Sequence, residues 1–348
     1  MREQFRCSLY NVLMSAKAYL VLGLAILYIV ILRLQFLRPT PDNIVSPRPS
    51  PAPYWAVRSI DTMKYSRDIA REKMEDTSFD TVIDEQIKNI ANTGASHVAI
   101  ATPYDPEFIP FLTRWVEAAR RYNLKVWFRG NASGWEQWFG YSQITRDEHK
   151  AVIVDFIKSN GDLFENGDIF TPCPECENGG EGDPRVVGGV EGYRAFLIDE
   201  YNISRDAFRS IGKNVQVGYF SMNYDVAKLV MDKPTTAALG GVVAIDHYVR
   251  THERLADDLI AIEESSGGKI YLGEWGAPIP DIHGKMTGDE QAAWIKDALE
   301  VFKADKNVIG LNYWVNVGGS TEIWNSRGEA SPAMPIITEY YSRLEIPQ

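Results

Sequence analysis

Short apolar runs alternate with amphipathic stretches along the chain from residue 55 onward. The apolar runs are typical of buried strands, and the stretches between them repeat apolar residues three and four positions apart, as one face of a helix requires. Residues 79–95 are an example, because their apolar side chains recur on a single helical face. The pattern predicts helices between strands at residues 59–66, 97–104, 125–131, 167–175, 215–224, 241–249, 269–276 and 308–319.

Eight strands that alternate with helices over about 290 residues predict an α/β fold, a (β/α)8 TIM barrel. A doubly wound open sheet is the alternative. It would carry a glycine-rich phosphate-binding turn after its first strand. No such turn follows residues 59–66, so the barrel is the preferred interpretation.

The first 54 residues have a different pattern. Residues 18–32 carry no charge, and with their flanks they approach the roughly 20 residues that span a bilayer. No A-x-A cleavage pattern follows, so residues 18–37 are predicted as a transmembrane signal anchor, with a cleaved signal and a secreted protein as the alternative. Residues 1–17 are then cytoplasmic, and the long following domain is extracytoplasmic. Residues 38–54 form a Pro-rich linker, and residues 55–348 form the folded domain.

Charge and cysteine content narrow the function. The net charge is −11 at pH 7, and no Lys/Arg-rich run occurs outside the N-terminus, which argues against nucleic acid as a partner. Cys173 and Cys176 form one C-x-x-C without a second Cys or His pair, so a closed metal site is not expected and the two thiols are free or bridged. Five histidines are too few to predict a metal-dependent hydrolase.

Barrel enzymes carry their chemistry at the C-terminal ends of the strands. Here carboxylates end the fourth and seventh predicted strands: Glu175, with Glu177 as its alternative, and Glu274. Two carboxyl groups about 5–5.5 Å apart can share the acid and nucleophile roles at a glycosidic bond. Aromatic rings bind sugar faces, and the candidate substrate-binding residues at strand ends are Arg129, Asn131, Trp135, Trp138, Asn223, His247, Tyr248, Trp275, Asn312 and Trp314.

Some of these candidates have a second interpretation. Trp135 and Trp138 form either a sugar platform or a packed lid. His247 is either a site residue or a barrel histidine with satisfied hydrogen bonds. Arg129 either orients a carboxylate or makes a structural ion pair, and the ring of Trp314 packs in the core if it does not bind substrate.

Three segments carry a family resemblance. YLGEWGAP (271–278) resembles the strand-seven nucleophile motif of the clan of retaining (β/α)8 glycoside hydrolases that contains the cellulase- and mannanase-type enzymes of family 5. DHYV (246–249) is similar to its strand-six region, and LNYWVN (311–316) resembles its strand-eight Trp segment. The resemblance runs in order from residue 55 to residue 344.

The resemblance implies roles for individual residues. By this resemblance, Glu274 is the nucleophile and Tyr248 is its hydrogen-bond partner. Glu175 is the acid/base residue, and the ring of Trp314 forms the floor of the site. One position departs from the pattern: Pro174 stands where the clan carries an Asn that contacts the sugar 2-hydroxyl.

The leading hypothesis is a membrane-anchored, extracytoplasmic retaining glycoside hydrolase that cleaves β-glycosidic bonds of a poly- or oligosaccharide by a double displacement between two glutamates. Such a mechanism needs no metal and no organic cofactor. A non-catalytic carbohydrate-binding protein on the same barrel is the alternative. The expected partners are a carbohydrate and, through residues 18–37, a membrane. A monomer is the default expectation.

Overall fold

The computed structural model describes Leu27 and residues 52–345. Apart from Leu27, the predicted segments 1–17 and 18–37 and the linker up to residue 51 lie outside the described residues. Within the described part, no helix has the length and apolar character needed to cross a membrane. Residues 52–345 belong to one compact unit.

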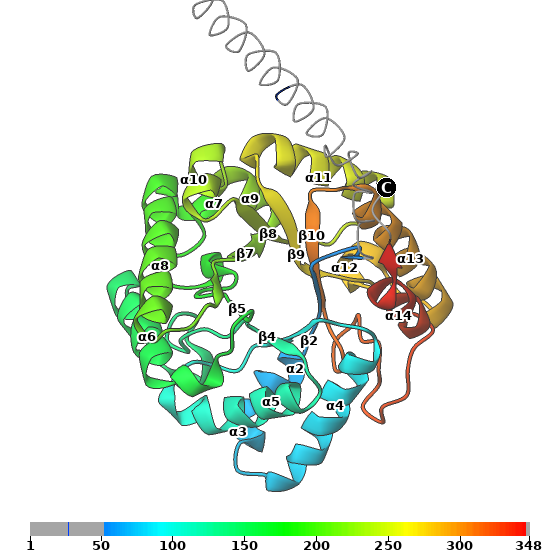
Figure 1. The fold of residues 1–348 in the computed structure, drawn as a ribbon, viewed down its shortest axis with the longest axis horizontal. Coiled ribbons are helices and arrows are strands. Elements are labelled where there is room, and N and C mark those ends of the chain that lie inside the picture. Colours follow the sequence, from blue (N-terminus) through cyan, green and yellow to red (C-terminus); the bar gives the residue numbers. More distant parts are fainter. Residues whose placement is uncertain (1–26, 28–51, 346–348) are drawn as a thin grey trace, which may run out of the picture. The chain divides into compact units, whose positions relative to one another are not determined.

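Nine parallel strands form one curled sheet in the order β6-β5-β4-β3-β2-β10-β9-β8-β7, and helices surround it (Figure 1). This confirms the predicted α/β class with a TIM-barrel-like sheet. β6 pairs with β5 and β7 pairs with β8, and both lie in the stretch predicted as a single fifth strand. The strands are β2 (Val57–Asp61), β3 (His97–Ile100), β4 (Lys125–Phe128), β5 (Ile169–Phe170), β6 (Gln216–Val217), β7 (Ser221–Asn223), β8 (Val242–Asp246), β9 (Lys269–Trp275) and β10 (Val308–Tyr313).

Amphipathic helices cover the outer face of the sheet. Thr145 caps α6 and Thr287 caps α13, each in a capping box with the Glu three residues later. Gly267, with φ of 64°, ends α11. The main helices are α4 (Asp80–Asn92), α5 (Ile109–Arg121), α6 (Arg146–Ser159), α8 (Val190–Ser210), α9 (Tyr224–Val230), α10 (Lys233–Ala238), α11 (His252–Ser266), α13 (Gly288–Ala304) and α14 (Met334–Ser342).

Shorter helices lie in the connections. They are α2 (Met63–Ser66), α3 (Ala70–Lys73), α7 (Pro184–Val187), α12 (Pro280–His283) and the 3-10 helices η1 (Thr77–Phe79), η2 (Pro106–Phe108), η3 (Trp138–Gly140), η4 (Gly161–Leu163) and η5 (Cys176–Asn178).

Several strands end earlier than the apolar pattern predicted. The first strand was predicted at 59–66, but β2 ends at Asp61 because Asp61 Oδ1 accepts a hydrogen bond from the backbone N–H of Met63 (2.7 Å) and so starts α2. The fourth was predicted at 167–175, but β5 contains only Ile169–Phe170. The residues beyond it form a loop at the C-terminal face of the sheet.

The apolar core has two layers. Inside the sheet, Trp127 of β4 and Tyr271 of β9 meet edge to face with centroids 6.1 Å apart, although three strands separate them in the sheet order. A larger cluster lies between sheet and helices. Side chains on the strands therefore alternate between the inside of the ring and the helix layer.

The two ends of the described unit pair with each other. β1 (Ala52–Pro53) runs antiparallel to β11 (Leu344–Glu345). Trp55 is 1% exposed and packs edge-on against Tyr341 of α14. The last residues of the predicted linker thus belong to the folded unit.

Candidate active site

A β-bulge in β9 sets the direction of Glu274. Ile245 and Asp246 of β8 pair with Leu272 and Glu274, so Gly273 is an extra residue in β9. A bulge of this kind breaks the alternation of side chains and redirects the residue that follows.

The bulge separates Glu274 from its neighbour Trp275. Tyr271 faces the inside of the ring, and unbroken alternation would put Trp275 there too. Instead Trp275 is fully buried in the helix layer, edge-on to Phe302 and Tyr313 at 5.0 and 5.1 Å. Trp275, predicted as a sugar-binding residue, thus lies away from the inside of the ring, because the sequence does not reveal the bulge.

Arg129, at the end of β4, connects Glu274 to other strands. Its Nη1 donates to Asp61 Oδ2 (2.7 Å) and its Nη2 to Ser221 Oγ (2.8 Å). Nη2 also lies 3.2 Å from Glu274 Oε1 and 3.6 Å from Asp246 Oδ2. Burial alone lowers the pKa of Arg129, but the carboxylates of Glu274, Asp246 and Asp61 outweigh it and raise that pKa above its ordinary value. Arg129 thus both orients Glu274 and makes a structural ion pair.

The second oxygen of Glu274 binds Tyr248. The Tyr248 hydroxyl donates to Glu274 Oε2 at 2.9 Å. Burial raises the pKa of Glu274 to about 7, Arg129 opposes the rise, and the charge of Glu175 adds to it. Burial and then Glu274 raise the pKa of Tyr248, so its hydroxyl keeps the proton that it donates.

Glu175 lies in the loop after β5. Its backbone has φ of 43°, in the left-handed region, and its N–H donates to the Ser221 carbonyl at 2.7 Å. The half-buried carboxyl group accepts from Asn178 Nδ2 (3.1 Å) and Asn223 Nδ2 (3.5 Å). Burial, followed by the charge of Glu177, raises the pKa of Glu175. An acid held in its protonated form can act as a proton donor.

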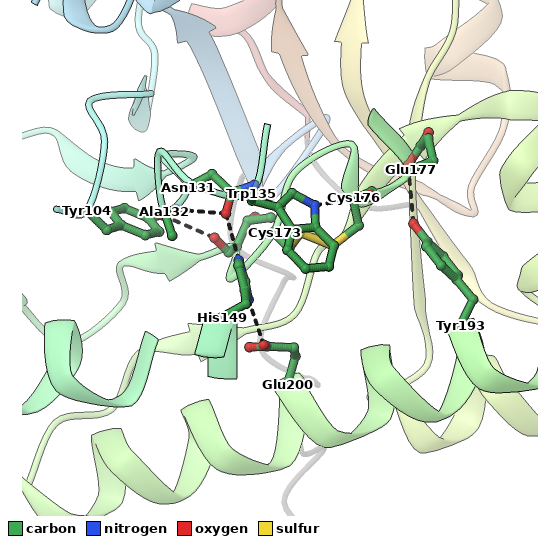
Figure 2. The surroundings of a disulfide bond; sticks show 11 residues. Tyr104, Asn131, Ala132, Trp135, His149, Cys173, Cys176, Glu177, Tyr193 and Glu200 are labelled. Carbon is green, nitrogen blue, oxygen red and sulfur yellow. Dashed lines mark hydrogen bonds and ion pairs between the residues drawn. A yellow bond between two sulfur atoms is a disulfide. The ribbon is translucent and has the colours of Figure 1, made fainter. Parts of the chain in front are cut away.

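Glu177 is bound on both oxygens. It is 3% exposed, and its Oε1 accepts from Asn223 N (2.7 Å) and Nδ2 (3.1 Å). Its Oε2 accepts from the Tyr193 hydroxyl at 3.3 Å (Figure 2). The geometry therefore favours Glu175 as the acid/base and Glu177 as the neighbour that raises its pKa.

Three further predicted residues lie beside Glu175 or Glu274. Asn223 contacts Glu175, and Tyr248 contacts Glu274. The Trp314 ring lies at right angles to the Tyr248 ring, with centroids 6.2 Å apart. All three are only half-buried, which leaves part of each side chain available to a ligand.

Other predicted substrate-binding residues are enclosed by protein. Trp135 is stacked on Phe196 at 5.2 Å, and the face of Trp138 is covered by the Arg67 guanidinium at 4.6 Å. Trp135 is buried, which fits the packed-lid alternative, whereas Trp138 is half-buried and its role stays a prediction. Three polar residues are also buried with protein partners: Asn131 with His149, His247 with Asp258, and Asn312 with Asp61. Their polar groups are used in these contacts, which support the site or the core.

The sequence patterns did not single out three carboxyl groups of this region. Asp61 fell inside the first predicted strand, although an Asp before Thr-Met is a helix-start signal. Asp246 was recognised only as a polar residue at a strand end. Glu136 is half-buried in the loop after β4, and burial raises its pKa to about 7, with Arg67 opposing. Within residues 52–345, no three His, Cys, Asp or Glu side chains form a group that could hold a metal ion.

Comparison with known proteins identifies the fold. No protein-family model and no curated protein sequence matches the chain. A GH5_18 structure from Bifidobacterium longum subsp. longum, in complex with Manb1-4GlcNAc, has a TM-score of 0.62 at 15% identity over 82% of this chain and 78% of that one. The chain has the fold of this glycoside hydrolase. A GH5_18 structure from Bifidobacterium longum subsp. infantis gives 0.59 at 14% identity, over 82% and 78% of the two chains.

The same fold occurs in larger enzymes. The beta-D-glucuronidase of Dictyoglomus thermophilum has a TM-score of 0.53 at 15% identity, over 76% of this chain. This chain covers 48% of that enzyme's length, so the common part is the barrel.

Proposed function

We propose that the protein is a retaining glycoside hydrolase that cleaves β-glycosidic bonds of a poly- or oligosaccharide. One observation carries the proposal: Glu274 is turned into the ring and held by Arg129 and Tyr248, close enough to Glu175 for the charge of Glu175 to raise its pKa. A carbohydrate ligand is also supported by the disaccharide complex of the GH5_18 structure.

The surroundings of the two carboxyl groups assign their roles. Burial raises the pKa of both groups, and the charge of Glu175 adds to the rise at Glu274, so the two carboxyl groups titrate as a pair. Arg129 and Tyr248 stabilise the charged form of Glu274. Glu175 has only amide donors and lies near Glu177, which disfavours its charged form. Glu274 therefore takes the negative charge and Glu175 the proton.

This distribution of charge fits a double displacement. Glu274 attacks the anomeric carbon while Glu175 protonates the leaving oxygen, which gives a glycosyl-enzyme ester. Glu175 then takes a proton from water, whose oxygen displaces Glu274 with net retention.

A carbohydrate-binding protein without activity is the second candidate. Pro174 favours it, because this residue has no N–H and no amide side chain with which to bind a substrate hydroxyl. Such a protein would bind glycans without releasing new reducing ends, whereas the enzyme would do both.

The proposal includes the location. We infer a single-pass anchor at residues 18–37 with the catalytic unit outside the cytoplasm, or its secreted form after signal cleavage. The Cys173–Cys176 disulfide supports this location, since disulfides persist in oxidising compartments.

The decisive test compares Glu274→Ala with Glu175→Ala on a substrate found by screening β-linked polysaccharides for new reducing ends. Glu274→Ala should lose at least about 10³-fold for every leaving group, because no ester can form. Glu175→Ala should lose about 10²–10⁴-fold on the polysaccharide but little on a dinitrophenyl glycoside, whose leaving group needs no proton. Azide should give a product of inverted configuration with Glu274→Ala and of retained configuration with Glu175→Ala.

Glu177→Gln is the comparison variant: it should lower the pKa of Glu175 and shift the pH profile, but Glu175 remains as the proton donor, so the wild-type dependence on leaving group should be kept. If Glu177→Gln and not Glu175→Ala shows the acid/base pattern, the assignment within this loop is wrong. If Glu274→Ala retains wild-type activity, the proposed mechanism is wrong.

A further inference from the structure

The proposed acid/base residue lies inside a disulfide-closed loop. Cys173 and Cys176 are bonded, with Cα atoms 5.2 Å apart, and only Pro174 and Glu175 lie between them. The sequence left these thiols either free or bridged. Both cysteines are buried, at 0% and 2% exposure.

Glu175 is not mounted on a strand. β5 ends at Phe170, five residues before Glu175, so the hydrogen bond from the Glu175 N–H to the Ser221 carbonyl of β7 (2.7 Å) is its backbone link to the sheet. The left-handed φ of 43° is also unfavourable for a residue with a side chain and persists only where the surroundings impose it. A catalytic group needs a rigid support, and the contacts with β7 leave the rest of that support to the loop itself.

A buried polar chain holds the Cys173 end of this loop. Figure 2 shows His149 between Asn131 and Glu200, with both contacts at 2.7 Å. Asn131 Oδ1 also accepts from the Ala132 N–H, which fixes the amide orientation and directs Nδ2 toward Cys173 Sγ at 3.7 Å. The sulfur is therefore supported by a network anchored on α6 and α8.

The Cys176 end is held by a different group. Trp135 Nε1 donates to the Cys176 carbonyl at 3.0 Å, and the indole is stacked on Phe196 of α8. The Trp135 carbonyl accepts from the Gly180 N–H at 2.9 Å, just beyond the loop. Both ends of the disulfide loop are thus held by side chains that pack against the helix layer.

We propose that the Cys173–Cys176 disulfide is the positioning element of the acid/base residue, so that breaking it impairs proton transfer selectively. The inference rests on the proposed function of Glu175. A dithiol reductant gives two electrons and two protons to the disulfide, forms two thiols and becomes a cyclic disulfide itself. The loop then loses its covalent closure, whereas the contacts of Glu274 with Arg129 and Tyr248 involve neither cysteine.

The first experiment uses the full-length Cys173→Ser/Cys176→Ser variant. Rates on glycosides with poor leaving groups should fall by about 10–100-fold, the scale expected for misplacing a catalytic group by about 1 Å. Rates on a dinitrophenyl glycoside should stay within about threefold of wild type, and azide should accelerate turnover. Cys7→Ser is the matched control and should behave as wild type. Wild-type leaving-group dependence in the double variant, or equal losses on all substrates, would overturn the proposal.

The second experiment does not depend on the double variant folding. The folded Cys7→Ser protein is treated with dithiothreitol, and exposed thiols are counted by alkylation. Because both cysteines are buried, reduction should be slow, and loss of activity on poor leaving groups should follow thiol exposure in time. Full reduction without that loss contradicts the proposal.

A third measurement separates this inference from the proposed function. Hydrogen exchange of the peptide 171–180 should accelerate upon reduction, with little change in β9. If the wild type hydrolyses no glycoside, the proposed function fails. Unchanged exchange in this peptide after full reduction would show independently that the disulfide does not position Glu175.

Discussion

Asp246 is a buried acid beside the proposed nucleophile. It is 4% exposed, and neither carboxyl oxygen has a hydrogen-bond partner within the distance and angle limits of a hydrogen bond. Burial, followed by the charge of Glu274, raises its pKa well above the ordinary value, with Arg129 opposing. Burial and the neighbouring Glu274 therefore favour the neutral form of Asp246. Arg129 is then balanced by Asp61 and Glu274.

The protonation of Asp246 can be tested by Asp246→Asn, which resembles the neutral acid in shape. A carboxyl group with a raised native pKa binds more protons in the native state, so it costs stability as pH rises above its unfolded pKa. The gain in unfolding free energy of the variant over wild type should therefore be larger at pH 8 than at pH 5, as measured by urea unfolding. Asp61→Asn is the contrasting control, since it removes a 2.7 Å partner of buried Arg129 and should cost about 3–5 kcal/mol. A variant of Asp246 that loses more stability at pH 8 would show that this carboxyl group is charged.

At the scale of elements, the β9 bulge is the feature on which the site depends. A Cβ atom on Gly273 would lie 2.5 Å from Asp246 Oδ1 and 2.6 Å from Ser221 Cβ. Both neighbours lie on packed strands, so they have little room to move. Glycine thus allows β9 to bring Glu274 close to β7 and β8.

Gly273→Ala should therefore disturb the bulge. We expect a loss of about 1–3 kcal/mol in unfolding free energy from overpacking, measured by urea unfolding, together with a fall in kcat as Glu274 moves away from Arg129. Gly192→Ala is a suitable control, because in α8 the added Cβ would come no closer than 3.4 Å to Arg146 Nη1. If Gly273→Ala is as stable and active as wild type, the bulge does not need glycine.

Hydrophobic periodicity predicted the helices and strands better than it predicted the direction in which individual side chains point. The helices and their caps at Thr145 and Thr287 follow local signals, and the strand alternation gave the sheet class. The burial of Trp135 and Trp275 could not be predicted in this way. It depends on a loop packed under α8 and on one inserted residue in β9, which are properties of the tertiary structure.

The same limit applies to the site. The family resemblance implied that Glu274 and Tyr248 pair, and the structure has a 2.9 Å hydrogen bond between them. The carboxylate partners of Arg129 were not predicted, because they come from strands far apart in sequence. Long-range ion pairs of this kind have no local pattern.

At the scale of the whole molecule, the two ends of the described unit pair with each other. β1 pairs with β11, and Trp55 is buried against α14. A fragment that begins after Trp55 would lose both contacts, whereas one that begins at residue 51 keeps them. β1 lies on the N-terminal side of the boundary predicted at residue 55, so we expect residues 52–54 to contribute to the stability of the folded unit.

Removal of residues 1–50 should separate membrane attachment from folding. The full-length protein should remain in the membrane fraction after a carbonate wash, because residues 18–37 are apolar enough to span a bilayer. The fragment 51–348 should be soluble, with the same unfolding midpoint and the same activity as the full chain. The fragment 57–348 is the control for the boundary, and it should be less stable by about 3–5 kcal/mol through loss of the buried Trp55 indole. Release of the intact full-length chain by carbonate would contradict the anchor, and a mature chain starting within residues 38–54 would indicate the cleaved signal instead.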